Sequence, residues 1–102
     1  MSRSLDNVLT VSVGGAAGDG VREAGTTLGT LLTNVGFHTF MSFKYPSLIR
    51  GGHNYARISF AKEKIFYDYP HVDVLVALNE DTIKKQRHRL NPDGIILGDA
   101  FD

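Results

Sequence analysis

The sequence predicts an α/β fold in which helices cover both faces of a mostly parallel β-sheet that carries one inserted β-hairpin. Two apolar runs, at residues 8–13 and 72–78, are typical of strands buried on both faces, as in a parallel sheet. A segment with helical periodicity follows each run, at residues 21–35 and from 80 to about 90, and implies a crossover connection. A chain of 102 residues is long enough for one small domain with one core.

The composition narrows the class of protein before any motif is considered. Eleven basic and eleven acidic side chains cancel, which argues against attraction to nucleic acid or a membrane surface by charge alone. The chain has no cysteine, so it carries no disulfide, thiolate metal site, cysteine nucleophile or cysteine-ligated iron–sulfur cluster of its own. Residues 1–7 lack the apolar core of a signal peptide, and no apolar run approaches the length of a membrane span. We therefore expect a cytoplasmic protein with no membrane or nucleic-acid partner.

The first apolar run leads into a glycine-rich loop at residues 14–20 and then into the first helix. The apolar positions of this helix recur at helical spacing and are Val21, Ala24, Leu28, Leu31, Leu32 and Val35. Gly25 and Gly29 lie four residues apart on one side of the helix, which predicts close approach to the sheet or to another chain. Gly36 is expected to end the helix, because glycine readily adopts the left-handed conformation found after the last turn.

The middle of the chain predicts three short strands. Residues 37–43 and 54–60 alternate between two sets of side chains, as strands do. A polar turn at residues 62–64 separates the second strand from residues 65–67, so we expect 54–60 and 65–67 to pair as the inserted hairpin. Between the first two strands lies a loop at residues 44–53, which contains a proline and a pair of glycines.

A second strand–helix–strand unit follows. Asn79 comes after the strand at residues 72–78 and is expected to cap the next helix, whose first turn carries two acidic residues that complement the helix dipole. The helix is expected to run to about Leu90 and to end in a basic, solvated stretch. A turn at residues 91–94 and a strand at residues 95–97 come next, which makes this unit the second crossover.

One edge of the predicted sheet gathers several loops. In sheets of this class, ligands bind beyond the carboxyl ends of the parallel strands. The segments expected there are residues 14–20, 44–53, 79–81 and 98–99. Two of them are the glycine-rich segments, and this coincidence predicts a binding site at that edge.

The loop Gly15-x-x-Gly18-x-Gly20 leaves two interpretations open. Glycine lets the backbone approach a ligand closely, and the unpaired N–H groups of a following helix attract an anion. However, no Lys-Ser/Thr pair follows, as it does in a P-loop, and no acidic residue follows the second strand to bind a ribose. Asp19 suits the start of a helix but would repel a phosphate. The alternative is a tight strand-to-helix turn with no ligand.

The second loop combines several reactive side chains, Ser47, Arg50 and His53, with the flexible backbone of Gly51. Arg50 is suited to clamp a carboxylate or phosphate, and His53 to transfer protons near neutral pH. A surface loop whose arginine pairs with a carboxylate of another chain explains the pattern equally well. No nucleophile triad or metal-ligand spacing emerges, so we assign no catalytic residue and no metal site.

Taken in order, six segments resemble the gamma domain of 2-oxoacid:ferredoxin (flavodoxin) oxidoreductases. They are residues 14–21, 24–29, 45–54, 57–59, 73–80 and 93–99. The Ser-Leu-Ile-Arg-Gly-Gly-His-Asn run at residues 47–54 is most similar to alpha subunits that carry the gamma domain fused at their N-terminus.

The resemblance implies a Rossmann-like three-layer domain, of which residues 1–102 form the N-terminal portion, so we expect a truncated domain. It implies a complex that oxidatively decarboxylates a 2-oxoacid to acyl-CoA and passes electrons to ferredoxin, with thiamine diphosphate, an iron–sulfur cluster and coenzyme A. The thiamine and cluster sites lie in other parts of such complexes, so this chain alone is expected to bind no cofactor and to be inactive. The implied partners are the remaining alpha-subunit domain, the beta subunit and, through the complex, ferredoxin; a homo-oligomer stays open.

The resemblance also implies a set of cofactor-binding candidates, carried over by position. They are Gly15, Gly18, Asp19 and Gly20 in the first loop, and Ser47, Arg50, Gly51 and His53 in a loop that faces a neighbouring domain. Whether the second loop contacts coenzyme A or only protein stays open, as does the identity of the 2-oxoacid. The alternative function is a non-catalytic nucleotide-binding or subunit-assembly module.

Overall fold

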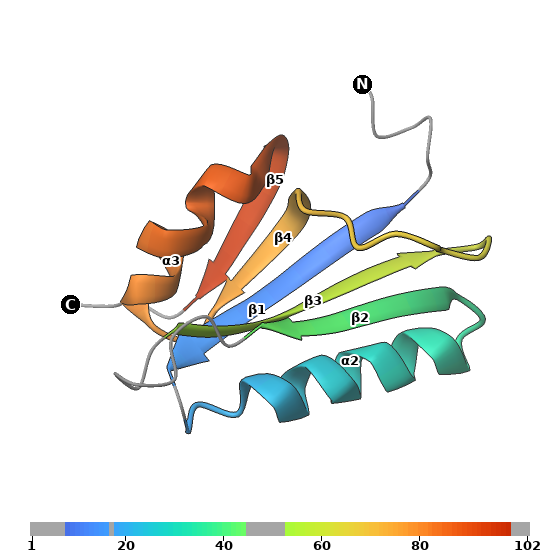
Figure 1. Cartoon of the computed structure of the whole chain (residues 1–102), viewed down its shortest axis with the longest axis horizontal. Helices are drawn as coiled ribbons and strands as arrows, with labels where there is room; N and C mark the ends of the chain where they lie inside the picture. The colour runs from blue at the N-terminus through green and yellow to red at the C-terminus, as the bar shows by residue number, and fades with distance from the viewer. Residues whose placement is uncertain (1–7, 17, 45–52, 99–102) are drawn as a thin grey trace.

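The computed structural model describes residues 8–16, 18–44 and 53–98, which form one five-stranded sheet and its helices (Figure 1). In chain order the elements are β1 Leu9–Ala16, α2 Val21–Asn34, β2 His38–Lys44, β3 His53–Ala61, β4 Val72–Ala77, α3 Glu80–Gln86, the 3-10 turn η1 Arg87–Arg89 and β5 Leu90–Gly98. The helices in this part of the chain are too short or too polar to cross a membrane.

The sheet has the strand order β2-β3-β1-β4-β5. β1, β4 and β5 pair in parallel, whereas β3 runs antiparallel to both of its neighbours, β1 and β2. All strands except β3 therefore point the same way, which confirms the predicted α/β class. Right-handed crossovers that leave the centre of a sheet in opposite directions place their helices on opposite faces, so α2 and α3 form the two outer layers.

The predicted hairpin of residues 54–60 with 65–67 was wrong. β3 pairs with β2, and the residues expected to pair with it, 65–67, form no strand. The physical reason is the position of β3 inside the sheet. Both of its edges are already hydrogen-bonded, one to β1 and one to β2, so no edge remains for a further strand. The 62–71 segment instead leads irregularly from β3 to β4.

The last predicted turn was also wrong. Residues 91–94 belong to β5, which begins at Leu90. The helix predicted to about Leu90 is an α-helix to Gln86 and continues as the 3-10 turn η1 to Arg89. Pro92 cannot donate a backbone hydrogen bond, but β5 lies at the edge of the sheet, where proline is tolerated. The pairing register between β4 and β5 shifts between Val72 and Val74, and this shift accommodates residues 91–94.

The main core lies between α2 and the sheet. Its fully buried members are Val13, Val21, Ala56 and Ile58, and the partly buried side chains packed around them are Val11, Ala24, Leu28, Leu32, Phe43 and Val76. Leu31 and Val35 belong to the same apolar pattern but are 58% and 71% exposed. The helix therefore buries only part of its apolar surface against the described residues.

The helical glycines behave as predicted. A Cβ added at Gly25 would lie 2.8 Å from the Cβ of Ala56, and one added at Gly29 would lie 2.7 Å from the sulfur of Met41. The missing side chains thus bring α2 close to β3 and β2. Gly36 has φ of 106°, the left-handed conformation expected just after a helix.

The opposite face of the sheet contains an unusually polar layer. The hydroxyls of Thr10 and Ser59 are 2.8 Å apart, and the carboxylate of Asp73 accepts hydrogen bonds from the Thr10 N–H and the Asn91 amide, both at 2.9 Å. Because Asp73 lies on β4, Thr10 on β1 and Asn91 on β5, these bonds tie three strands together.

Candidate functional site

The glycine-rich loop closes with a compact turn after β1. The Ala16 N–H donates to the Asp19 carboxylate at 2.8 Å, and the Asp19 N–H donates to the Ala16 carbonyl at 3.1 Å. Gly18 and Gly20 have φ of 91° and 80°, a region that residues with a Cβ rarely adopt. The two glycines are therefore needed for the turn itself.

β1 continues further into the glycine-rich segment than predicted, to Ala16 instead of residue 13. The extension has a tertiary cause, because Gly14 pairs with Tyr55 and Gly15 with Asn54 of β3. A Cβ at Gly15 would lie 2.9 Å from the Asp19 carboxylate and 3.1 Å from the Cβ of Leu78. Gly15 thus permits the turn and the end of β4 to pack against each other.

A hollow of about 520 Å³ opens beside this turn. It is lined by Ala16, Gly18, Gly20, Val21, Arg22, Glu23 and Asn54. The N-cap of α2 is Gly20, which has no side chain to accept a hydrogen bond from the N–H groups of the first turn. Such a helix start attracts an anion, although Glu23 in the lining opposes one.

Arg22 is a cation that lines this hollow. Its guanidinium lies 4.5 Å from the centre of the Phe43 ring, in a cation–π contact that holds the side chain against β2. The first turn of α2 therefore combines a helix N-terminus that has no side-chain cap with a positioned positive charge.

The second predicted loop is described only in part. Ser47, Arg50 and Gly51 lie outside the described residues, and His53 is described for its backbone alone. His53 begins β3 and pairs with Ala16, next to the glycine turn. Asn54, which follows it, lines the hollow. The structure therefore brings the flank of the second loop to the first, whereas the predicted binding roles of the loop residues stay predictions.

The other predicted segments end at the same edge of the sheet, because β4 and β5 run parallel to β1. Asn79 caps α3 as expected, with its side-chain oxygen accepting from the Thr82 N–H at 3.0 Å and the Thr82 hydroxyl at 2.7 Å. Gly98 is the last residue of β5, and Asp99 lies outside the described residues.

Five residues that line the hollow were not among the predicted site residues: Ala16, Val21, Arg22, Glu23 and Asn54. Arg22 and Asn54 matter most, because their side chains can bind an anion or a polar ligand. A signal for each was present in the sequence. Arg22 is the second residue after the glycine loop, and Asn54 shares the alternating pattern of Ala56 and Ile58, so it lies on the face of β3 that meets α2.

An ion-pair cluster on the other face of β3 also escaped the sequence analysis. Arg57, only 5% exposed, donates to both carboxylate oxygens of Asp68, from Nε at 3.0 Å and from Nη2 at 2.9 Å. Lys44 lies 3.3 Å from the same carboxylate. The hydrogen bond from Arg57 holds the pKa of Asp68 below its ordinary value, opposing the effect of burial, and the charge of Arg57 and the contact with Lys44 add to this shift.

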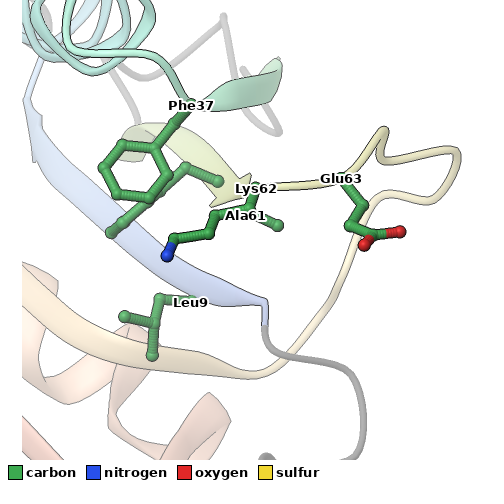
Figure 2. Close-up of a pocket in the computed structure, with 6 residues that line it drawn as sticks. Leu9, Phe37, Ala61, Lys62 and Glu63 are labelled. Carbon is green, nitrogen blue, oxygen red and sulfur yellow. The ribbon is translucent and has the colours of Figure 1, made fainter.

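A second hollow, of about 360 Å³, lies where β1 begins and β3 ends, at the opposite end of these strands from the glycine turn. Figure 2 shows the Lys62 side chain extending between Phe37 and Leu9, while the Glu63 carboxylate points away. Of the predicted site residues that the structure describes, none lines this second hollow. Among the residues that the structure describes, no group of three or more His, Asp or Glu side chains is placed to hold a metal ion.

Comparison with known sequences yields a family whose match spans nearly the whole chain. Residues 10–102 match the family described as pyruvate ferredoxin/flavodoxin oxidoreductase. A 2-oxoacid:ferredoxin oxidoreductase alpha subunit from Sulfolobus is 27% identical over 71 residues, and one from Sulfurisphaera tokodaii is 25% identical over 71 residues. In each case the match covers 70% of this chain and 11% of the relative, so the matched part of this chain spans about a tenth of the length of these alpha subunits.

Solved structures show the same fold. A 2-oxoglutarate:ferredoxin oxidoreductase from Magnetococcus marinus, solved with 2-oxoglutarate, coenzyme A and succinyl-CoA bound, matches with a TM-score of 0.82 and 20% identity, over 91% of this chain and 16% of that chain. A keto/oxoacid ferredoxin oxidoreductase gamma subunit from Geobacter sulfurreducens matches with a TM-score of 0.78 and 22% identity, over 89% of this chain and 50% of that one. These structures show the fold, and the family match over residues 10–102 establishes that the chain belongs to the pyruvate ferredoxin/flavodoxin oxidoreductase family.

Proposed function

We propose that this chain is the N-terminal portion of the gamma domain in a 2-oxoacid:ferredoxin oxidoreductase of the type fused to the alpha subunit. The complex would oxidatively decarboxylate a 2-oxoacid, transfer the acyl group to coenzyme A and reduce ferredoxin. The family match and the two alpha-subunit relatives support this assignment. The main structural support for a binding role of this chain is the hollow at the glycine turn, which is lined by the start of α2 and by Arg22.

The cofactors of such a complex differ in how well they fit this chain. An iron–sulfur cluster is held by thiolates, and the chain has no cysteine. A metal-bound diphosphate needs oxygen ligands, and the described residues offer no cluster of carboxylates for the metal. We therefore propose that the thiamine diphosphate and the clusters lie in the remaining alpha-subunit domain and the beta subunit, and that this chain forms one wall of the substrate site.

Coenzyme A fits the hollow better, because its phosphates are anions. Bound there, it would supply the thiol that accepts the acyl group. The N–H groups in the first turn of α2 and the guanidinium of Arg22 would hold a phosphate. Gly18 and Gly20 leave no side chain between the backbone and the ligand. The Asp19 carboxylate is already hydrogen-bonded within the turn, so its role in the proposal is to hold the turn in shape.

The proposal is tested on the assembled complex by following reduction of a viologen dye with a 2-oxoacid, coenzyme A and thiamine diphosphate. Arg22→Ala is expected to raise the KM for coenzyme A about tenfold, with little change in kcat, because a charge-assisted hydrogen bond contributes on the order of 1.5–3 kcal/mol. Arg22→Lys should recover part of the affinity, since it keeps the charge. Lys85→Ala, at an exposed helical ion pair with Asp81, is the matched control and should change neither constant.

Two results would contradict the proposal. If the complex reduces no dye with either pyruvate or 2-oxoglutarate, the assignment of the reaction fails. If Arg22→Ala leaves the coenzyme A KM unchanged, the hollow is not the phosphate site, and the alternative of an assembly module gains support. Calorimetry that shows adenine nucleotides binding without coenzyme A would favour the nucleotide-binding alternative.

A further inference from the structure

The face of the sheet opposite α2 carries a cluster of polar side chains whose hydrogen bonds are incomplete. Arg57 is 5% exposed, and its Nε and Nη2 both donate to Asp68. Its third nitrogen, Nη1, is buried and has no hydrogen-bond partner among the described residues. The same holds for the Ser12 hydroxyl and for the Nε of Arg89. Buried polar groups are nearly always hydrogen-bonded, so three such atoms in one region point to a ligand.

The three unpartnered atoms belong to side chains that gather around one aromatic ring. Ser12 of β1 pairs with Arg57 of β3, so these two side chains stand side by side on the same face. Tyr55 shares that face, because Ala56 between Tyr55 and Arg57 points into the core beneath α2. The centre of the Tyr55 ring lies 5.8 Å from the Cζ of Arg57 and 6.0 Å from the Cζ of Arg89. The two guanidinium groups therefore converge beside Ser12.

The charges of this cluster do not cancel. The cations are Arg57, Arg89 and Lys44, whereas the carboxylates on this face are Asp68 and Asp73. Both carboxylates already accept hydrogen bonds, and Asp68 compensates Arg57 and contacts Lys44. Among the described residues, Arg89 forms no ion pair with a carboxylate. The cluster is thus left with an excess of one positive charge, which one monovalent anion would cancel.

The chemistry of the three unpartnered atoms favours an anion over a water molecule. A guanidinium nitrogen can only donate hydrogen bonds, and a serine hydroxyl can donate one. Among these atoms a water molecule finds at most one acceptor, the Ser12 oxygen, for its own two hydrogens, whereas an anion accepts from all three. Because the atoms are buried, the ion has to be small and is enclosed as the chain folds. A carboxylate side chain that arrives from another subunit would not reach them.

We propose that Ser12, Arg57 and Arg89 bind one small monovalent anion of the size of chloride. Arg57 is held in place by its two hydrogen bonds to Asp68, whereas the long side chain of Arg89 adjusts to make room for the ion. Arg89 lies on η1, which directly follows α3, so the ion joins the α3 layer to β1 and β3 in the middle of the sheet. The site is separate from the glycine turn, and the proposal does not depend on the reaction proposed above.

The direct test is a crystal structure of the assembled complex grown with bromide in place of chloride, because bromide is located by its anomalous scattering. The expected result is an anomalous peak within hydrogen-bonding distance of the Arg57 Nη1 and the Arg89 Nε. In crystals of the Arg89→Gln complex the peak should disappear. The proposal is overturned if the unaltered complex shows no bromide peak at this place, or if a water molecule or a carboxylate occupies it.

Hydrogen exchange of backbone amides measures the effect of the ion in solution. In the complex, the β3 peptide should exchange about threefold more slowly in about 0.3 M chloride than in gluconate at equal ionic strength, because an ion that binds only the closed state opposes local opening. Gluconate serves as the reference because it is too large for the site. Arg89→Gln should remove the difference between the salts, whereas Lys85→Ala, at an exposed ion pair on α3, should retain it. Equal exchange of the unaltered complex in both salts would contradict the proposal.

Discussion

At the scale of single residues, several glycines act by the absence of one carbon atom. Gly25 leaves room for Ala56, a backbone-anchored neighbour, whereas Gly29 leaves room for the end of the Met41 side chain. The difference matters because Met41 can change rotamer but the Cβ of Ala56 cannot move without its strand. Gly25 and Gly29 look equivalent in the sequence, but only Gly25 faces a neighbour that cannot move aside.

Gly25→Ala is expected to destabilise the protein by about 1 kcal/mol. Overpacking against Ala56 costs about 1–3 kcal/mol, and the gain in helix propensity of about 1 kcal/mol offsets part of it. Gly29→Ala should be close to neutral, because Met41 can yield. Urea unfolding of both variants gives the comparison, and a Gly25→Ala protein as stable as the Gly29→Ala protein would contradict the predicted close contact with β3.

Asp19 is the other residue whose role the structure specifies. The sequence placed it among the candidates for cofactor binding, beside Gly15, Gly18 and Gly20. In the structure its carboxylate accepts the Ala16 N–H and stands against Gly15, so it acts on the shape of the turn. The three glycines are needed by the turn for reasons of conformation and space.

At the scale of the elements, the 62–71 segment is tied to the sheet through one side chain. Asp68 accepts two hydrogen bonds from Arg57 and one from the Ser42 hydroxyl at 3.3 Å, and it pairs with Lys44. Arg57 is buried, so its charge depends on this carboxylate for compensation. The segment forms no strand, and this cluster anchors it across β2 and β3.

Asp68→Asn is expected to lower the free energy of unfolding at pH 7 by about 2 kcal/mol, because it removes the charge from hydrogen bonds to a buried guanidinium. Lys85→Ala breaks an exposed ion pair with Asp81, in which both side chains are 52% exposed, and should change the free energy of unfolding by about 0.5 kcal/mol or less. Urea unfolding at pH 7 measures both. Equal effects of the two substitutions would show that the Asp68 cluster contributes no more to the free energy of unfolding than an exposed ion pair does.

The same carboxylate makes stability depend on pH. Its pKa is lowered in the folded state, so the unfolded chain takes up the proton first as the pH falls. The contribution of Asp68 is therefore fully present above the ordinary carboxyl pKa of about 4, and it is lost as the pH falls from there through the lower folded value. The free energy of unfolding, measured from pH 6 to 3, should fall less steeply in Asp68→Asn than in the unaltered chain. If the two proteins lose stability equally with pH, the lowered pKa of Asp68 is contradicted.

At the scale of the whole molecule, the strand directions assemble the candidate site. β1, β2, β4 and β5 all end at one edge, where the glycine turn, the start of β3 and the cap of α3 meet. The fold thus brings the candidate binding residues that the structure describes to a single edge of the sheet.

The isolated chain is expected to reduce no dye with a 2-oxoacid, coenzyme A and thiamine diphosphate, whereas the assembled complex does. The reason is chemical, because a chain without cysteine has no thiolates to hold a cluster that carries electrons. The two preparations are compared in one assay at matched concentrations. Dye reduction by the isolated chain above the no-enzyme control would contradict the proposed division of the complex.

The sequence by itself determined the features that depend on near neighbours: the glycine turn, the Asn79 cap, the Gly36 helix end, the helical glycines and, apart from the strand expected at residues 65–67, the order of strands and helices. These follow from local conformation and spacing, which a single stretch of chain contains. The tertiary structure alone decided the partner of β3, the early start of β5 and the pairing of Arg57 with Asp68. Each of these depends on which strand edges and charges remain available once distant segments have met, and no local pattern encodes that.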